Sequence, residues 1–153
     1  MAAVMAESGL ESVREVLRRV LWLMNDESGG VLWQGPELLG EILVQVPDLR
    51  PEFAPLLPPY LVEEPFERGA AWGLARLARV QPALWHGREG ELSTALADPD
   101  PFVRAHVAVA LAALGRAEAR SVSGDPTPIS VYDPAAGILK KTTVGALMAA
   151  VEH

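Results

Sequence analysis

The sequence contains no cysteine. Disulfide bonds, thiolate zinc sites and cysteine nucleophiles are therefore excluded. The opening stretch MAAVMAESG has no basic region followed by an apolar run, so we expect no signal peptide. No segment approaches the roughly 18 apolar residues of a membrane span. Together these absences predict a soluble, cytoplasmic protein.

Positive charge is also scarce, with 13 Lys and Arg against 20 Asp and Glu and a net charge of −7. Proteins that bind nucleic acids or anionic membranes need basic surfaces, because the phosphates they contact are negative. The basic residues are dispersed along the chain, with Arg14, Arg18 and Arg19 in one segment and Lys140-Lys141 in another. The sequence therefore predicts neither a nucleic-acid partner nor a membrane partner.

Aromatic residues make up only 6% of the chain, whereas 50% of its residues are hydrophobic. Alanine is abundant in the second half, which favours closely packed helices over a sheet of β-branched residues. Ser8 and Glu11 fit a capping box before the first helix. Pro55, Pro58 and Pro59 fall within the third helical pattern and predict a short or kinked helix, because an interior proline costs about 3 kcal/mol. The expected helices span residues 10–24, 36–46, 50–61, 65–80, 88–97 and 101–114.

The helical part of the chain contains an internal repeat. A shift of 36 residues places Phe66 on Phe102 and Arg68 on Arg104, and a shift of 35 brings the helix at 36–46 into the same apolar register. Three helix pairs result, at roughly 10–46, 50–80 and 88–115. Two helices per repeat at this period indicate an all-α fold, a short α-solenoid in which each pair packs on the next.

Residues 96–115, LADPDPFVRAHVAVALAALG, resemble a HEAT-type repeat of the bilin-lyase (PBS-lyase) kind. The matching features are the Asp-Pro-Asp loop, the Val-Arg pair, the alanines and the closing Leu-Gly. Residues 25–41 are similar to small bacterial HEAT-like proteins. The resemblance implies a helical scaffold, and by analogy with bilin lyases it implies an accessory lyase or chaperone for a tetrapyrrole-type cofactor as one alternative function.

The composition changes after Gly115. A linker at 121–126 precedes two segments with strand character, 129–132 and 138–143, around a five-residue loop, followed by a helix at 144–151. We expect residues 1–120 to form the helical repeat domain. Residues 121–153 then form a linker, a β-hairpin and a terminal helix that cap the same domain, because the end of a solenoid must be covered. The alternative is a mobile arm that docks a partner through the edge of the hairpin.

The repeat register places a set of charged and aromatic side chains on the inner helices, which line the concave face of an α-solenoid. Tryptophan bordered by arginine and glutamate is typical of the centre of a protein interface. The alternative is that Trp72 packs on the tail and that Glu41 and Arg76 form an ordinary surface ion pair. The predicted partner-binding residues are Trp33, Glu37, Glu41, Trp72, Arg76 and Arg79.

Arg68 and Arg104 occupy equivalent positions in two repeats, each just inside a helix start and next to an acidic loop. We expect both to serve structure by bridging to such a loop in their own or a neighbouring repeat. Asp98 and Asp100 belong to the loop that precedes the last repeat helix and are assigned the same structural role.

A carboxylate cluster at Asp26, Glu27, Glu37 and Glu41 offers oxygen ligands for Mg²⁺ or Ca²⁺. The alternative is a turn followed by a solvated helix face. His86, His106 and His153 are widely spaced, and His106 occupies a helix-packing position, so we expect no histidine metal site.

No glycine-rich phosphate loop, GxSxG elbow or HExxH motif is present. We expect no catalytic residue and no cofactor. The residues favour a non-catalytic protein-interaction module or adaptor with a protein partner. A tetrapyrrole-handling protein and a divalent-metal-binding protein are the alternatives, and the exposed ends of the solenoid could pair into a homodimer.

Overall fold

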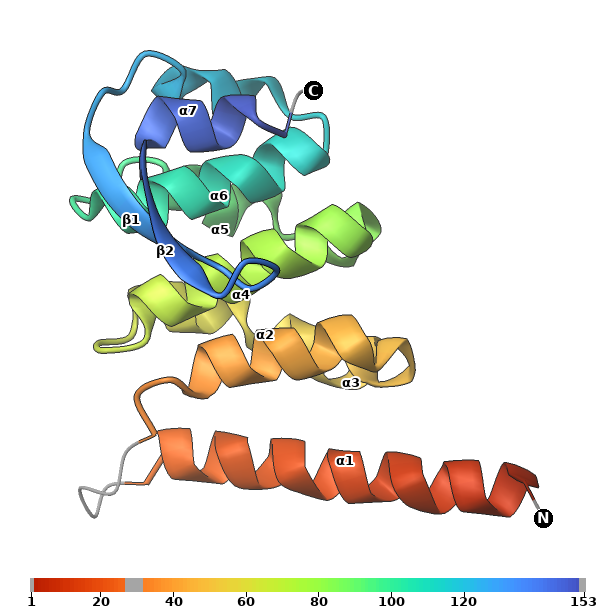
Figure 1. The fold of residues 1–153 in the computed structure, drawn as a ribbon. Coiled ribbons are helices and arrows are strands. Elements are labelled where there is room, and N and C mark those ends of the chain that lie inside the picture. The colour runs from red at the N-terminus through yellow and green to blue at the C-terminus, as the bar shows by residue number, and fades with distance from the viewer. Residues whose placement is uncertain (1, 27–31, 152–153) are drawn as a thin grey trace.

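The computed structural model describes residues 2–26 and 32–151, which are mostly helical and carry a two-stranded antiparallel sheet near the C-terminus (Figure 1). None of the helices within these residues has both the length and the apolar character needed to span a membrane. With η denoting a 3-10 helix, the elements are α1 (Ala2–Met24), α2 (Gly35–Gln45), η1 (Pro47–Leu49), α3 (Arg50–Phe53), η2 (Ala54–Leu56), η3 (Pro58–Val62), α4 (Glu67–Val80), η4 (Pro82–Trp85), α5 (Glu89–Ala95), α6 (Pro101–Ala113), η5 (Ala117–Val122), β1 (Pro128–Asp133), β2 (Ile138–Thr143) and α7 (Val144–Ala149).

Helix α1 begins earlier than the capping-box pattern predicts. Ser8 lies inside the helix, where its carbonyl accepts a 3.0 Å hydrogen bond from the Ser12 hydroxyl, so the prediction of a cap at Ser8 is wrong. The residues before Ser8 are mainly alanine, methionine and glutamate, which are strong helix formers, and the helix therefore extends through them. Leu17, Val20 and Met24, which lie at helical spacing on one side of α1, are buried against the core.

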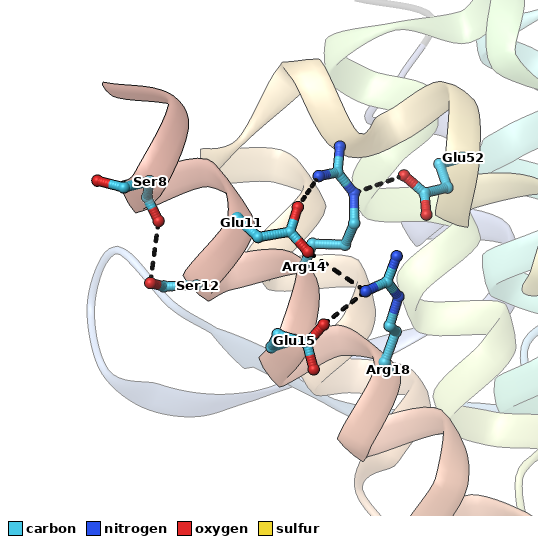
Figure 2. A network of polar contacts seen from close by, with 7 residues as sticks. All are labelled: Ser8, Glu11, Ser12, Arg14, Glu15, Arg18 and Glu52. Carbon is cyan, nitrogen blue, oxygen red and sulfur yellow. Dashed lines mark hydrogen bonds and ion pairs between the residues drawn. The ribbon is translucent and has the colours of Figure 1, made fainter. Parts of the chain in front are cut away.

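The outer side of α1 carries a network of ion pairs (Figure 2). Arg14 pairs with Glu11 of its own helix, and its Nε donates to Glu52 Oε2 of α3 at 2.9 Å. Arg18 pairs with Glu15 at 2.5 Å. Exposed pairs of this kind contribute about 0–1 kcal/mol each. Among the pairs drawn, Arg14–Glu52 is the one that joins two elements, α1 and α3.

The proline-rich segment is folded into the short α3 and the 3-10 turns η2 and η3, which confirms the predicted interruption of the third helix. Prolines lack the N–H that an α-helix interior needs, and a 3-10 turn tolerates them at its start. Phe53, Leu57 and Leu61 are still buried. Arg50, itself buried, donates to the carbonyls of Leu43 at 2.7 Å and Val44 at 2.9 Å and so caps the end of α2.

Helices α2, α4 and α6 lie side by side (Figure 1). Small residues allow this close packing. Gly73 of α4 faces Gly40 and the carbonyl of Pro36, and Gly69 lies against the Glu37 side chain. In α6, Ala105, Ala108 and Ala110 are fully buried. This close packing at Gly69 and Gly73 brings the polar side chains of α2 and α4 onto one face.

The C-terminal hairpin and helix follow the predicted order. β1 pairs with β2 in a register that sets Val131 opposite Lys140 and Asp133 opposite Ile138, so the turn holds four residues, 134–137, rather than the predicted five. The Thr143 hydroxyl accepts from the Ala146 amide at 3.2 Å and caps α7. The hairpin crosses α6 and reaches α4 (Figure 1). Its placement across these helices decides the shape of the candidate site.

Candidate functional site

The hairpin divides the face formed by α2, α4 and α6 into two hollows. One, the acidic groove, has a volume of about 550 Å³ and is lined by Glu37, Leu38, Glu41 and Leu139 among others. The other, the basic cavity, has a volume of about 490 Å³ and is lined by Arg76, Arg79, Lys140 and Lys141 among others. Trp72 and Tyr132 line both.

Glu41 in the acidic groove is held by an arginine of the neighbouring helix. Arg76 Nε donates to Glu41 Oε2 at 3.1 Å and Arg76 Nη2 donates to Oε1 at 3.0 Å. The guanidinium carbon also lies 6.0 Å from the centre of the Trp72 ring. A two-pronged pair of this kind fixes both side chains and neutralises the Glu41 charge. It leaves Glu37 as the free carboxylate of the groove.

Glu37 is partly buried beside Gly69. Its Oε2 atom is shielded from solvent and receives no hydrogen bond from the residues that the structure describes. Burial raises the pKa of this carboxyl, because the charged form loses hydration, and a hydrogen bond from its own backbone opposes the shift only in part. Glu37 therefore brings to the groove a carboxyl that no ion pair among the described residues compensates.

The rim of the acidic groove carries apolar side chains exposed to solvent. Leu139 of β2 is 71% exposed, Tyr132 of β1 is 49% exposed and Leu38 of α2 is 42% exposed. Trp33, 65% exposed, is flanked in the chain by Leu32 and Gln34, which line the groove. Exposed apolar side chains gathered around a hollow are typical of a binding surface.

The basic cavity gathers positive charge from two distant segments. Lys140 pairs with Asp133 and Arg76 pairs with Glu41. Within residues 2–26 and 32–151, Arg79 and Lys141 have no ion pair, and both are exposed. The cavity therefore carries two uncompensated cations in a protein whose net charge is −7.

His106 lies in the wall of the basic cavity and is neutral. Its Nδ1–H donates to the Phe102 carbonyl at 2.8 Å, and its ring stacks on the Phe102 ring with centroids 4.1 Å apart. Burial lowers the pKa of this imidazole to about 4, an effect to which the nearby Arg79 charge adds. His106 therefore packs the helix, as the sequence predicts, and also forms an uncharged patch of cavity wall.

Comparison with protein-family models, curated proteins and solved structures found no match for the chain.

The six predicted partner-binding residues do not form one open face. Glu37, Glu41 and Trp72 line the acidic groove, Trp72, Arg76 and Arg79 line the basic cavity, and Trp33 lies outside both linings. The Glu41–Arg76 ion pair of the alternative interpretation is present, and Trp72 lies beside the hairpin residue Tyr132.

Sequence reasoning missed the contribution of the hairpin. Tyr132, Leu139, Lys140 and Lys141 all line one or both hollows, although none was singled out for a site. Lys140-Lys141 is distant from Arg76 and Arg79 in sequence, and the fold brings them to one cavity. The available signal was the alternation of the hairpin strands, but the surface that the hairpin covers depends on tertiary packing.

The four residues assigned a structural role hold one loop. Arg68 Nε donates to Asp100 Oδ2 at 2.5 Å and joins α4 to the loop before α6. Asp98 Oδ1 accepts from the Asp100 amide at 2.8 Å, and Asp100 Oδ1 accepts from the Phe102 amide at 2.9 Å, capping α6. Arg104 Nη1 donates to the carbonyl of Asp98 at 2.9 Å, and its Nη2 donates to Asp125 Oδ2 at 3.1 Å.

The four carboxylates proposed as metal ligands have separate surroundings where they are described. Glu41 is engaged by Arg76 and Glu37 lies against Gly69. Asp26 already has an interaction of its own, and Glu27 lies outside the described residues. In the part of the chain that the structure describes, no three His, Asp or Glu side chains gather as a metal site would require.

Proposed function

We propose that the protein is a non-catalytic interaction module that binds a segment of a protein partner in the acidic groove. The observation that carries this proposal is that two features occur together at the acidic groove. Leu38, Tyr132 and Leu139 expose apolar surface around the groove, and Glu37 lines the same groove with a carboxyl that forms no ion pair among the described residues. Apolar area supplies affinity, and an unpaired charge supplies selectivity.

The scaffold of this module is, in our proposal, a short α-solenoid of three HEAT-like helix pairs. The stacking of α1, α2, α4 and α6 in chain order supports it (Figure 1). At the far end, Val144 and Met148 of α7 are buried where α7 packs on α6, which supports a capping role for the tail. The absence of cysteine supports a cytoplasmic location.

The groove also indicates the chemistry of the partner. Its charge is negative, because Glu41 is compensated by Arg76 while Glu37 is not. A lysine or arginine of the partner placed beside Glu37 would attract this carboxylate and favour its charged form. Apolar residues on either side of that cation would cover Leu38 and Leu139. The expected partner segment is therefore amphipathic and basic.

A peptide-display selection with the purified protein tests the proposal. Enriched peptides are expected to combine apolar residues with Lys or Arg. Leu139→Asp places a charge on the rim of the groove and is expected to weaken binding of those peptides at least tenfold. Val62→Asp is the matched control, since Val62 is 85% exposed and does not line the groove. Equal binding by the two variants, or enrichment of acidic peptides, would refute the proposal.

A further inference from the structure

We propose that the basic cavity is a second, separate binding site, and that it takes a small organic anion with an apolar aromatic body. The acidic groove repels such a molecule, so the two sites differ in ligand class. They also differ in the side chains that carry them, apart from the shared Trp72 and Tyr132.

Charge is the first ground for the proposal. Arg76, Arg79, Lys140 and Lys141 come from α4 and β2 and line one cavity. Asp133 and Glu41 compensate two of them. Arg79 and Lys141 have no acidic partner among the residues described, so the cavity keeps a positive excess. An anion bound there gains attraction that increases as the site excludes water.

The walls are the second ground. Trp72, Val109, Val131 and Leu147 contribute apolar surface, and His106 adds an imidazole that is neutral at physiological pH. An aromatic body can lie against these side chains while its acidic group stays with the cations. Sites for small molecules combine mainly apolar walls with a few charged groups in this way.

The volume of the basic cavity favours a small molecule over a macromolecule as its ligand. The cavity volume of about 490 Å³ falls within the roughly 300–1,000 Å³ of small-molecule sites. The hairpin encloses one side, because Val131, Pro134 and Ala135 line the cavity opposite α4 and α6. A nucleic acid would need a larger basic surface than a protein with a net charge of −7 provides.

The enclosing turn is held in place by the protein's own hydrogen bonds. Asp133 Oδ1 accepts from the amides of Ala135 at 2.9 Å and Ala136 at 3.1 Å, and Gly137 adopts a positive φ of 68° that closes the turn. Lys140 pairs with the other oxygen of Asp133. The cavity is therefore preformed, which lowers the cost of ordering it on binding.

The test uses a matched pair of fluorescent probes and the full chain. 8-Anilinonaphthalene-1-sulfonate is an aromatic anion, and N-phenyl-1-naphthylamine is the same aromatic body without the sulfonate. Titration with the wild-type protein is expected to give saturable, one-to-one binding of the anion and binding of the neutral probe at least tenfold weaker.

Two double variants then locate the site. Arg79→Gln with Lys141→Gln removes the uncompensated cations and is expected to raise the Kd of the anion at least tenfold. Arg19→Gln with Arg116→Gln removes the same charge from exposed residues that do not line the cavity, and is expected to leave that Kd within twofold. All four side chains are exposed, so both variants are expected to fold, which circular dichroism checks.

The proposal is overturned if the two double variants bind the anion equally, or if wild-type protein binds both probes with equal affinity. Leu139→Asp separates a failure of this proposal from a failure of the proposed peptide site in the acidic groove. It is expected to lose peptide binding and to retain the anion, because Leu139 does not line the basic cavity.

Discussion

Gly40 of α2 faces Gly73 of α4 where the two helices cross, and a Cβ atom on Gly40 would lie 2.8 Å from the Gly73 Cα. That atom belongs to backbone and cannot rotate away, so Gly40→Ala must push the helices apart. Overpacking of this kind costs about 1–3 kcal/mol, more than the roughly 1 kcal/mol that alanine gains in helix propensity. We expect Gly40→Ala to lower the free energy of unfolding, measured by urea denaturation.

Gly9→Ala is the matched control. Gly9 also lies inside a helix, α1, but a Cβ there would meet nothing within 4 Å. Only the higher helix propensity of alanine then acts, and we expect Gly9→Ala to stabilise the protein by about 0.5–1 kcal/mol. Two variants that change stability in the same direction would contradict the close crossing of α2 and α4.

The buried His106 makes stability depend on pH. Its pKa is about 4 in the folded protein against 6.5 in the unfolded chain, so between these values the unfolded chain binds a proton that the folded protein does not. Stability therefore falls as pH falls from about 6.5 to 4, by about 3 kcal/mol at most. The neighbouring charges oppose each other, since Arg79 disfavours the imidazolium and Asp100 favours it.

His106→Leu is expected to flatten the stability–pH curve in this window, as followed by chemical denaturation at a series of pH values. His86→Leu serves as control, because His86 is exposed, and should leave the slope unchanged. A steep slope retained by His106→Leu would assign the pH dependence to other groups.

Glu37→Gln is expected to stabilise the protein at pH 7. Burial raises the pKa of the Glu37 carboxyl, so the charged form that prevails at neutral pH is disfavoured in the folded state. The contribution of Glu37 to stability is thus greatest at pH values below 4.5, the pKa of this group in the unfolded chain. It is lost as the pH rises through the raised pKa of the folded protein. We expect a small gain at pH 7, reduced by partial solvent screening, and no difference near pH 4. Thermal melts of Glu37→Gln and of the exposed control Glu63→Gln check this.

Arg104 and Arg68 differ in exposure although they occupy equivalent positions. The Arg104 side chain is 19% exposed and bonds two loop carbonyls and Asp125, whereas Arg68 is 63% exposed and bonds Asp100 alone. We expect Arg104→Ala to cost about 1–3 kcal/mol because it leaves shielded acceptors unpaired. Arg68→Ala should cost about 0–1 kcal/mol. Equal losses in urea denaturation would mean that exposure does not decide the value of these bonds.

Local patterns in the sequence predicted much of the helical framework. The prolines at 55, 58 and 59 predicted the break after α3, and the helix predicted from residue 144 begins there as α7. The wrong prediction of a helix cap at Ser8 also has a local cause, because the strong helix formers before Ser8 extend the helix past it. Helix existence follows from short-range propensity and periodicity, which a single sequence displays.

The candidate site was harder to predict from the sequence, because it depends on contacts between segments that are far apart in the chain. Glu37, Glu41, Trp72, Arg76 and Arg79 each line one or both hollows, and their division between the two follows from where the hairpin lies. Nothing local to Lys140-Lys141 shows that it meets α4. The contact of Trp85 was equally hard to predict. Its indole N–H donates to the Leu74 carbonyl at 3.0 Å inside the core, and no local sequence pattern indicates that bond.

Trp72 is a wall of both hollows, and this has a consequence for regulation. Under our two proposals, a ligand in either hollow contacts the same indole ring, so we expect the two ligands to change each other's affinity. Thermodynamic linkage makes the effect reciprocal: the factor by which the anion changes peptide affinity equals the factor by which the peptide changes anion affinity. With Tyr132 the second shared side chain, the two proposed sites meet at one small surface, where occupancy of one changes the cost of occupying the other.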